Sequence, residues 1–264
     1  MLAELTKDKL KVEVYEDRAA LGQAAAAQVA IMMRQRLAEQ ETISMVFAAA
    51  PSQNEFLAEL CKAENLDWQR VTAFHMDEYV GLTAEAPQSF RRFLKEHLFD
   101  AVKPGQIHYL KGDVSDAVAE CQRYADLLTA QPPSIVCAGI GENGHLAFND
   151  PHIADFNDSL LVKVVDLDAA SRQQQVNDEC FEQLADVPTR ALTVTVPALT
   201  NAQSMFVVVP GKTKANAVHQ TLNAAVSTDC PATILRQHKG AVLLVDRDAA
   251  SQLAMPERVE TGAD

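Results

Sequence analysis

The sequence lacks an excess of positive charge. Lys and Arg together number 23 against 36 Asp and Glu, which gives a net charge of −13. Nucleic acids and anionic membrane surfaces are usually bound through basic patches, so this balance argues against both as partners. An anionic small molecule would need a local positive site within this negative field.

Long hydrophobic runs are missing as well. No apolar stretch approaches the about 18 residues that indicate a membrane span, and the charged N-terminal segment does not have the pattern of a signal peptide. The five cysteines are scattered, odd in number and without a Cys-x-x-Cys pair, which predicts reduced thiols rather than a disulfide framework or a zinc site. We therefore expect a cytoplasmic protein.

The 264 residues contain no internal repeat and no low-complexity linker, so we expect a single domain over residues 1–264 with a frayed tail after about residue 256. Strand-like and helix-like runs alternate. The expected strands cover residues 11–15, 43–50, 71–76, 134–140, 160–166, 191–196, 205–209 and 240–245. The expected helices cover residues 17–40, 52–63 (capped by Ser52), 87–99 (opened by Pro87), 114–130, 170–184, 213–223 and 232–237. This alternation predicts an α/β protein with a Rossmann-like, doubly wound, mostly parallel sheet and helices on both faces.

A carboxylate pair follows the expected strand 71–76. Asp77 and Glu78 stand directly after this apolar run. Ligands of open α/β sheets bind at the carboxyl ends of the strands, and a partly desolvated carboxylate there can act as a general base. The alternative for either residue is a turn cap or a partner of an arginine.

A glycine-framed histidine follows the expected strand 134–140. The spacing Gly139-x-Gly141-x-x-Gly144 matches the dinucleotide-binding fingerprint, which requires a helix that begins at the glycines. The run Asn149-Asp150-Pro151 opposes a continuous helix, which argues against nucleotide binding. The alternative is a tight turn that exposes a histidine suited to proton transfer near neutral pH.

The residues that such a turn would bring together are Asn143, His145 and Asp150. An adjacent amide or acid can fix the tautomer of the histidine. A third motif, the run Gly211-Lys-Thr-Lys214, follows the expected strand 205–209 and begins a helix, where free N–H groups and two lysines can bind an anion. Its alternative is a solvated helix start.

The first two motifs together resemble the glucosamine-6-phosphate deaminase (isomerase) family, within the glucosamine-6-phosphate isomerase/6-phosphogluconolactonase superfamily. The resemblance rests on Met76-Asp-Glu-Tyr-Val-Gly-Leu82 and on the long motif from Gly139 to Pro151. Shorter matches recur in order over most of the chain, among them Pro87-x-Ser89-Phe90 and Gly211-Lys-Thr-Lys214. The related 6-phosphogluconolactonases usually carry Asp-Glu-Arg where Asp77-Glu78-Tyr79 stands.

The resemblance implies an aldose-to-ketose isomerisation with loss of ammonia, without a metal or organic cofactor. It implies that Asp77 takes the C2 proton, that His145 opens the sugar ring, and that Asn143 and Asp150 orient or tune the histidine. Many family members have Asp and Glu at the last two positions. The substrate-binding residues that it implies are Ala50, Ser52, Glu78, Gly141, Gly144, Arg172 and Lys214.

The departures from the family concern the phosphate. The turn Ala49-Ala-Pro-Ser-Gln53 stands where the family usually has a glycine-containing Thr/Ser-rich turn, and Pro51 has no N–H to donate. The family's phosphate arginine is absent from its usual context, so Arg172 is the available substitute, while Lys214 matches a phosphate lysine. Losing one charge-assisted contact costs about 2–3 kcal/mol. The residues implied for proton transfer therefore match the family, whereas the residues implied for phosphate binding differ from it.

Four functions stay open at this point. The first is conversion of glucosamine-6-phosphate, or a close relative, to fructose-6-phosphate and ammonia, with a role in amino sugar metabolism and N-acetylglucosamine catabolism. The others are galactosamine-6-phosphate isomerisation, 6-phosphogluconolactone hydrolysis through His145, and non-catalytic sugar binding. The expected partner is a small-molecule sugar phosphate, and a homo-oligomer stays open.

Overall fold

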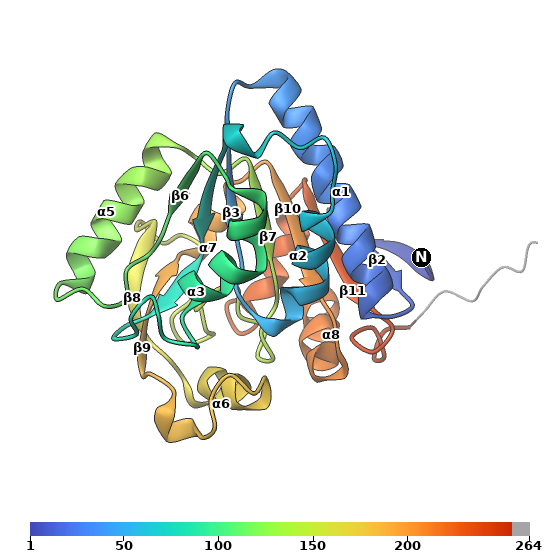
Figure 1. Cartoon of the computed structure of the whole chain (residues 1–264). Coiled ribbons are helices and arrows are strands. Elements are labelled where there is room, and N and C mark those ends of the chain that lie inside the picture. Colours follow the sequence, from blue (N-terminus) through green and yellow to red (C-terminus); the bar gives the residue numbers. More distant parts are fainter. Residues whose placement is uncertain (255–264) are drawn as a thin grey trace, which may run out of the picture.

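The computed structural model describes residues 1–254, and the tail expected to fray lies outside the described residues. The main feature is an eight-stranded sheet (Figure 1). Its strands are, in spatial order, β1 (Ala3–Lys7), β2 (Leu10–Tyr15), β11 (Ala241–Asp246), β10 (Ser204–Val209), β7 (Ile135–Ala138), β3 (Ile43–Phe47), β4 (Val71–His75) and β6 (Gln106–His108). The β1–β2 pair is antiparallel and every other neighbouring pair is parallel, which confirms the predicted fold class.

Helices cover both faces of this sheet, as predicted. The α-helices are α1 (Arg18–Glu39), α2 (Asn54–Cys61), α3 (Phe90–Leu94), α4 (Asp100–Val102), α5 (Ala117–Ala130), α6 (Ala169–Asn177), α7 (Val196–Thr200) and α8 (Ala215–Asn223). A π-helical turn, η3 (Lys95–Phe99), joins α3 to α4. The 3-10 turns are η1 (Pro51–Gln53), η2 (Trp68–Arg70), η4 (Leu184–Asp186), η5 (Lys212–Lys214) and η6 (Pro231–Gln237).

The core forms two layers because alternate side chains of each strand point to opposite faces. Met45 and Phe47 of β3 pack in one layer with α1, α2 and α3, whereas Val46 packs in the other layer with α5, α7 and α8. Strands that are buried on both faces are typical of parallel sheets. Among the residues described, no helix combines the length and the apolarity needed to cross a membrane.

A second sheet was not expected. It contains β5 (Asp77–Tyr79), β9 (Arg190–Val194) and β8 (Val162–Asp166), and both of its ladders are antiparallel. The expectation that the strands at 160–166 and 191–196 belong to the parallel sheet is therefore wrong. The chain leaves β4 at Met76, and its next three residues pair with β9 instead of continuing the main sheet.

Two expected helix starts are also wrong. Pro87 lies before α3, which begins at Phe90 because the Glu78 carboxylate accepts hydrogen bonds from the backbone N–H groups of Phe90 and Arg91. Ser52 does not cap α2 but lies within η1, where its Oγ accepts a hydrogen bond from the Gln53 side chain. The side chain that caps α3 is thus Glu78, which lies 12 residues before Phe90. Local sequence patterns could not show this contact.

The strand order reverses between β7 and β3. From β3 the chain continues outward through β4 and β6, and from β7 it continues in the other direction through β10 and β11. The loops after β3 and β7 therefore diverge and leave a crevice at the carboxyl ends of these strands, which is where open α/β sheets bind ligands. Figure 1 shows α6 lying across this end of the sheet.

Candidate active site

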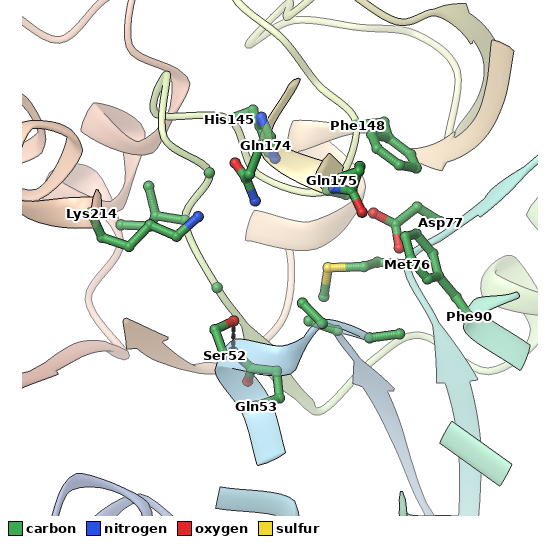
Figure 2. A pocket seen from close by; sticks show the side chains of 17 residues that line it. Ser52, Gln53, Met76, Asp77, Phe90, His145, Phe148, Gln174, Gln175 and Lys214 are labelled. Atoms are coloured by element: carbon green, nitrogen blue, oxygen red, sulfur yellow. Dashed lines mark hydrogen bonds between the residues drawn. The ribbon is translucent and has the colours of Figure 1, made fainter. Parts of the chain in front are cut away.

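A cleft lies in the crevice between the ends of β3 and β7 (Figure 2). Asp77 and His145 both line it, and Lys214 lines it as well. The other lining residues are Ala48, Ala49, Ala50, Ser52, Gln53, Met76, Phe90, Gly139, Ile140, Gly141, Ala147, Phe148, Gln174 and Gln175. The structure therefore brings the acid of the first motif, the histidine of the second and the lysine of the third into one site.

Asp77 offers a carboxylate that no group of the described residues stabilises. It is 8% exposed, and its surroundings in residues 1–254 supply neither a hydrogen-bond donor nor a cation to its side chain. Burial raises the pKa of Asp77 well above its ordinary value, and the neighbouring Glu78 carboxylate raises it further. A desolvated carboxylate of raised pKa that faces a cleft is suited to act as a general base.

Glu78 points away from the cleft. Its fully buried carboxylate accepts hydrogen bonds from Ser89 Oγ (2.8 Å) and from Arg91 Nε (3.2 Å), in addition to the N–H groups at the start of α3. The structure therefore does not bring Glu78 to the substrate side, although it was expected there. Its role here is to hold α3, and with it Phe90, against the cleft wall.

His145 is held by oxygens around one ring nitrogen. Its Nδ1 lies 2.8 Å from Asn143 Oδ1, 3.0 Å from Ser171 Oγ and 3.1 Å from Asp150 Oδ1. Since Nδ1 can donate its proton to these oxygens, the lone pair of Nε2 is left for a ligand. The ring lies directly on the backbone of Gly141, where a Cβ would stand 2.3 Å from Nε2, so this position requires glycine.

One carboxylate oxygen of Asp150 accepts several hydrogen bonds. Its Oδ1 accepts from Asn143 Nδ2 (3.0 Å), from Ser171 Oγ and from His145. Burial by itself raises the pKa of Asp150, but the hydrogen bonds and the charge interaction with His145 outweigh it and lower the pKa to about 2. The carboxylate therefore stays ionised and can stabilise a protonated His145. The sequence motifs did not indicate Ser171, which comes from α6.

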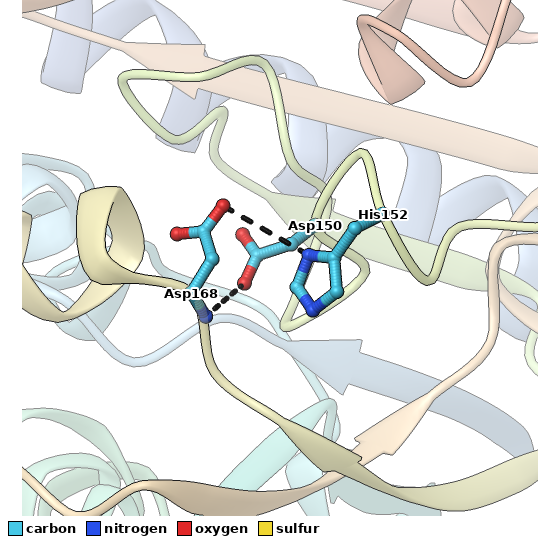
Figure 3. Close-up of side chains that lie close together, drawn as sticks. All are labelled: Asp150, His152 and Asp168. Atoms are coloured by element: carbon cyan, nitrogen blue, oxygen red, sulfur yellow. Dashed lines mark hydrogen bonds and ion pairs between the residues drawn. The ribbon is translucent and has the colours of Figure 1, made fainter.

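Asp150, His152 and Asp168 also lie together (Figure 3), with one potential ligand atom of each within 4.8 Å of the others. Both carboxylate oxygens of Asp168 already accept hydrogen bonds. Oδ1 caps α6 by accepting from Ser171 N (2.6 Å), and Oδ2 accepts from Asn143 Nδ2 (3.4 Å). We assign this cluster to orienting Asn143 and Ser171 around the histidine rather than to binding a metal.

Replacing Asn143 with Asp is expected to destabilise the protein at neutral pH. The Asn143 amide donates to both Asp150 and Asp168, and a carboxylate there would face two others. Like charges raise the pKa of the new acid, so the free energy of unfolding falls as the pH rises through that pKa. We expect a loss of about 1–3 kcal/mol at pH 8 that shrinks at pH 4. Thermal unfolding at both pH values measures it, with the exposed Asn157→Asp as the matched control. Equal stability at both pH values would contradict this network.

Lys214 supplies a buried cation at the other end of the cleft (Figure 2). It is 4% exposed, and burial lowers its pKa, although Asp178 and Glu142 raise it. Within residues 1–254 no acceptor forms a hydrogen bond with its ammonium group. The turn before it is held by Asp246, whose two carboxylate oxygens each accept from Gly211 N at 3.0 Å.

The four remaining residues that were expected to bind substrate do not all line the cleft. Ala50 and Ser52 line the cleft beside Gly139. Arg172 points away from it, and its guanidinium donates to the carbonyl oxygens of Leu184 and Val187. Arg172 therefore does not replace the missing phosphate arginine. Gly144 has a positive φ of 85° and supports the turn from behind, where its backbone packs against Cys230.

The side chains of Gln174 and Gln175 line the cleft (Figure 2). Gln174 accepts from Glu142 N (2.8 Å), while Gln175 points toward Asp77. The cavity volume of the cleft is about 60 Å³ with both glutamine side chains in its lining. The sequence contains them in the run Gln173-Gln-Gln175, but no local signal showed which glutamine faces the cleft.

Fold and site together define an α/β protein with an acid, a histidine and a lysine gathered in one cleft at the switch point of its sheet. The family model for glucosamine-6-phosphate isomerases/6-phosphogluconolactonase matches residues 16–244, and the chain belongs to this family. It is 39% identical over 196 residues to a glucosamine-6-phosphate deaminase of Exiguobacterium sp., covering 74% of this chain and 75% of that one. It is 35% identical over 215 residues to one of Listeria monocytogenes, covering 81% and 88%.

Solved structures of two proteins with related names have a similar fold. A monomeric glucosamine-6-phosphate deaminase superposes with a TM-score of 0.83 at 30% identity, covering 91% of this chain and 98% of that one. A 6-phosphogluconolactonase from Thermotoga maritima gives 0.73 at 22% identity, covering 90% and 100%, a likeness that concerns the fold alone.

Proposed function

We propose that this protein is an amino-sugar-phosphate deaminase/isomerase, which converts glucosamine-6-phosphate or a close relative to fructose-6-phosphate and ammonia. The observation that carries the proposal is the shared cleft of Asp77 and His145, with Lys214 at its other end. The relatives named above support the choice of substrate class.

The first step is ring opening. His145 Nε2 takes the proton of the O1 hydroxyl and a proton is returned to the ring oxygen, which breaks the C1–O5 bond and leaves an open-chain aldehyde. Asp150 stabilises the protonated imidazole of His145. The low pKa of Asp150 keeps its carboxylate anionic throughout this step. The oxygens around Nδ1 support this role because they hold the imidazole in place.

The second step is isomerisation. The Asp77 carboxylate takes the proton from C2 and gives it to C1, while the aldehyde oxygen gains a proton and the nitrogen loses one, so that the C1=O double bond is replaced by a C2=N imine. Water adds to this imine, and the C2–N bond breaks to give the ketose phosphate and ammonia. Because residues 1–254 supply no stabilising partner for Asp77, it is a stronger base than an ion-paired carboxylate would be.

Substrate is held at the Lys214 end. The Lys214 ammonium group, the Ser52 hydroxyl and the Gln174 amide line the cleft and can donate to the phosphate. The expected sugar-phosphate partner, the cytoplasmic location and the possibility of a homo-oligomer remain part of this proposal. Every residue that it requires comes from one chain.

Incubation with glucosamine-6-phosphate should release fructose-6-phosphate and ammonia in equal amounts. A coupled assay for the ketose phosphate and a separate assay for ammonia measure the two products, and galactosamine-6-phosphate tests the epimer. The same preparation is tested with 6-phosphogluconolactone, since His145 could also activate water for hydrolysis. Lactone hydrolysis without ketose formation would favour the hydrolase, and binding of the sugar phosphates without turnover would favour a non-catalytic role.

A further inference from the structure

A second and larger cavity opens beside the cleft. Its volume is about 400 Å³, within the ~300–1,000 Å³ range of small-molecule pockets. The two cavities share four wall residues, namely Ala49, Ala50, Phe90 and Gln175. We call this second cavity the side chamber. A ligand in the cleft could extend into it past Phe90 and Gln175.

The side chamber is mainly apolar. Pro51, Pro87, Phe93, Cys180 and Phe181 form much of its wall together with Phe90. The polar residues of its lining are Gln88, Ser89, Gln175, Glu179 and Glu182. The lining contains two carboxylates and, in the part of the chain that the structure describes, no Lys or Arg. This chemistry fits a neutral or cationic apolar group and disfavours a second anionic group.

The aromatic walls are fixed in place. Tyr79 packs against Phe90 at 4.9 Å and against Phe181 at 5.6 Å between ring centroids. Phe90 also stacks on Phe148 at 5.7 Å. Because these rings are locked by buried neighbours, they lose little conformational freedom when a ligand binds, which favours affinity for an apolar group.

The side chamber lies on the Asp77 side of the cleft. Figure 2 shows Phe90 and Gln175 next to Asp77, with Lys214 at the opposite end. This inference rests on the proposed function, in which C2 of the sugar lies at Asp77 and the phosphate lies at Lys214. A group that reaches the side chamber is therefore attached near C2.

Chemistry limits which atom can carry that group. The O1 hydroxyl has to be free, since a substituent on it blocks ring opening. The C2 nitrogen can carry an alkyl group and still react: the C2 proton moves to C1, the nitrogen forms an imine or iminium ion at C2, water adds, and the C2–N bond breaks. The nitrogen then leaves as a primary amine with its substituent, and water is the only co-reactant.

We propose that the side chamber binds an apolar or aromatic substituent on the 2-amino group, so that the substrate class is an N-substituted 2-amino-2-deoxy sugar phosphate and the leaving group is an amine. The ketose phosphate product is the same as in the unsubstituted reaction. The side chamber therefore determines specificity and takes no part in proton transfer.

The test compares N-benzyl-glucosamine-6-phosphate with glucosamine-6-phosphate on the full-length protein. One coupled assay follows the ketose phosphate from both, and chromatography follows benzylamine. We expect kcat/KM for the benzyl substrate to be about tenfold to a hundredfold higher, as burial of a ring in an apolar pocket predicts. Equal or lower kcat/KM for the benzyl substrate, with glucosamine-6-phosphate turned over, overturns the side chamber and leaves the proposed function intact. No ketose from either substrate overturns the proposed function, and this inference with it.

Two variants localise the effect. Gln88→Trp fills the side chamber and should lower the ratio of kcat/KM for the benzyl substrate to kcat/KM for glucosamine-6-phosphate at least tenfold. Gln122→Trp, on the exposed surface of α5, should leave this ratio unchanged. Phe93→Ala removes part of the wall and should also lower the ratio; Gln88→Trp decides the matter if Phe93→Ala does not fold. An unchanged ratio in Gln88→Trp would place the benzyl group elsewhere and overturn the proposal.

Discussion

Asp77→Asn should lower kcat by about 10²–10⁴ and abolish the exchange of the C2 proton with solvent. The amide keeps the shape of the carboxylate but cannot take a proton. Loss of deuterium from substrate labelled at C2 measures the step directly, and Asp186→Asn, on an exposed 3-10 turn, is the matched control. Undiminished exchange in Asp77→Asn would show that another group is the base.

The same variant should be more stable than the parent protein at neutral pH. Burial raises the pKa of Asp77 above its ordinary value of 3.8, so the folded state holds this proton more tightly than the unfolded state does. The free energy of unfolding therefore falls as the pH rises from about 3.8 through the folded pKa, and it then stays lower. Thermal unfolding should show the advantage of Asn at pH 7 and no advantage below pH 3.8. A variant that is inactive and less stable at pH 7 would indicate misfolding instead.

Lys214→Met should raise KM by roughly two orders of magnitude and change kcat much less. The ammonium group is the cation that the described residues place in the cleft wall, and losing a charge-assisted contact costs about 2–3 kcal/mol. Inorganic phosphate should inhibit the parent protein competitively and the variant far more weakly. Lys212→Met is the control, because Lys212 lies in the same turn with its side chain exposed. Equal KM values for the two variants would place the phosphate elsewhere.

Folding should tolerate Lys214→Met. The lowered pKa of Lys214 shows that burial penalises its charge, and methionine is an apolar chain of similar length. The proposed role of Lys214 in ligand binding therefore comes at some expense of stability.

Much of the site followed from local patterns. Apolar runs showed where β3, β4, β7 and β10 lie, and parallel strands bring their carboxyl ends to one edge of the sheet. That rule alone predicts that Asp77, His145 and Lys214 meet. The long motif around Gly141 then indicated a tight turn, and the contact between Gly141 and the His145 ring gives the physical reason for the glycine.

Other parts could not be read from the sequence. Asp77 and Glu78 are neighbours in one strand and so point to opposite sides, and only the pairing of β5 with β9 decides which carboxylate faces the cleft. Arg172 had the charge of a phosphate ligand, but the carbonyl groups of the 184–187 segment hold it elsewhere. Ser171 entered the histidine network through the position of α6, which no motif encoded.

By itself the sequence determined the fold class and predicted candidate proton-transfer residues and an altered phosphate site, because each depends on residue type and on spacing along the chain. Only the tertiary structure decided which side chains face the cleft, how the second sheet pairs, and that the side chamber adjoins the cleft. These depend on contacts between segments far apart in the chain, such as Phe90 and Phe181 against Tyr79, whose geometry is set by packing and not by local propensity.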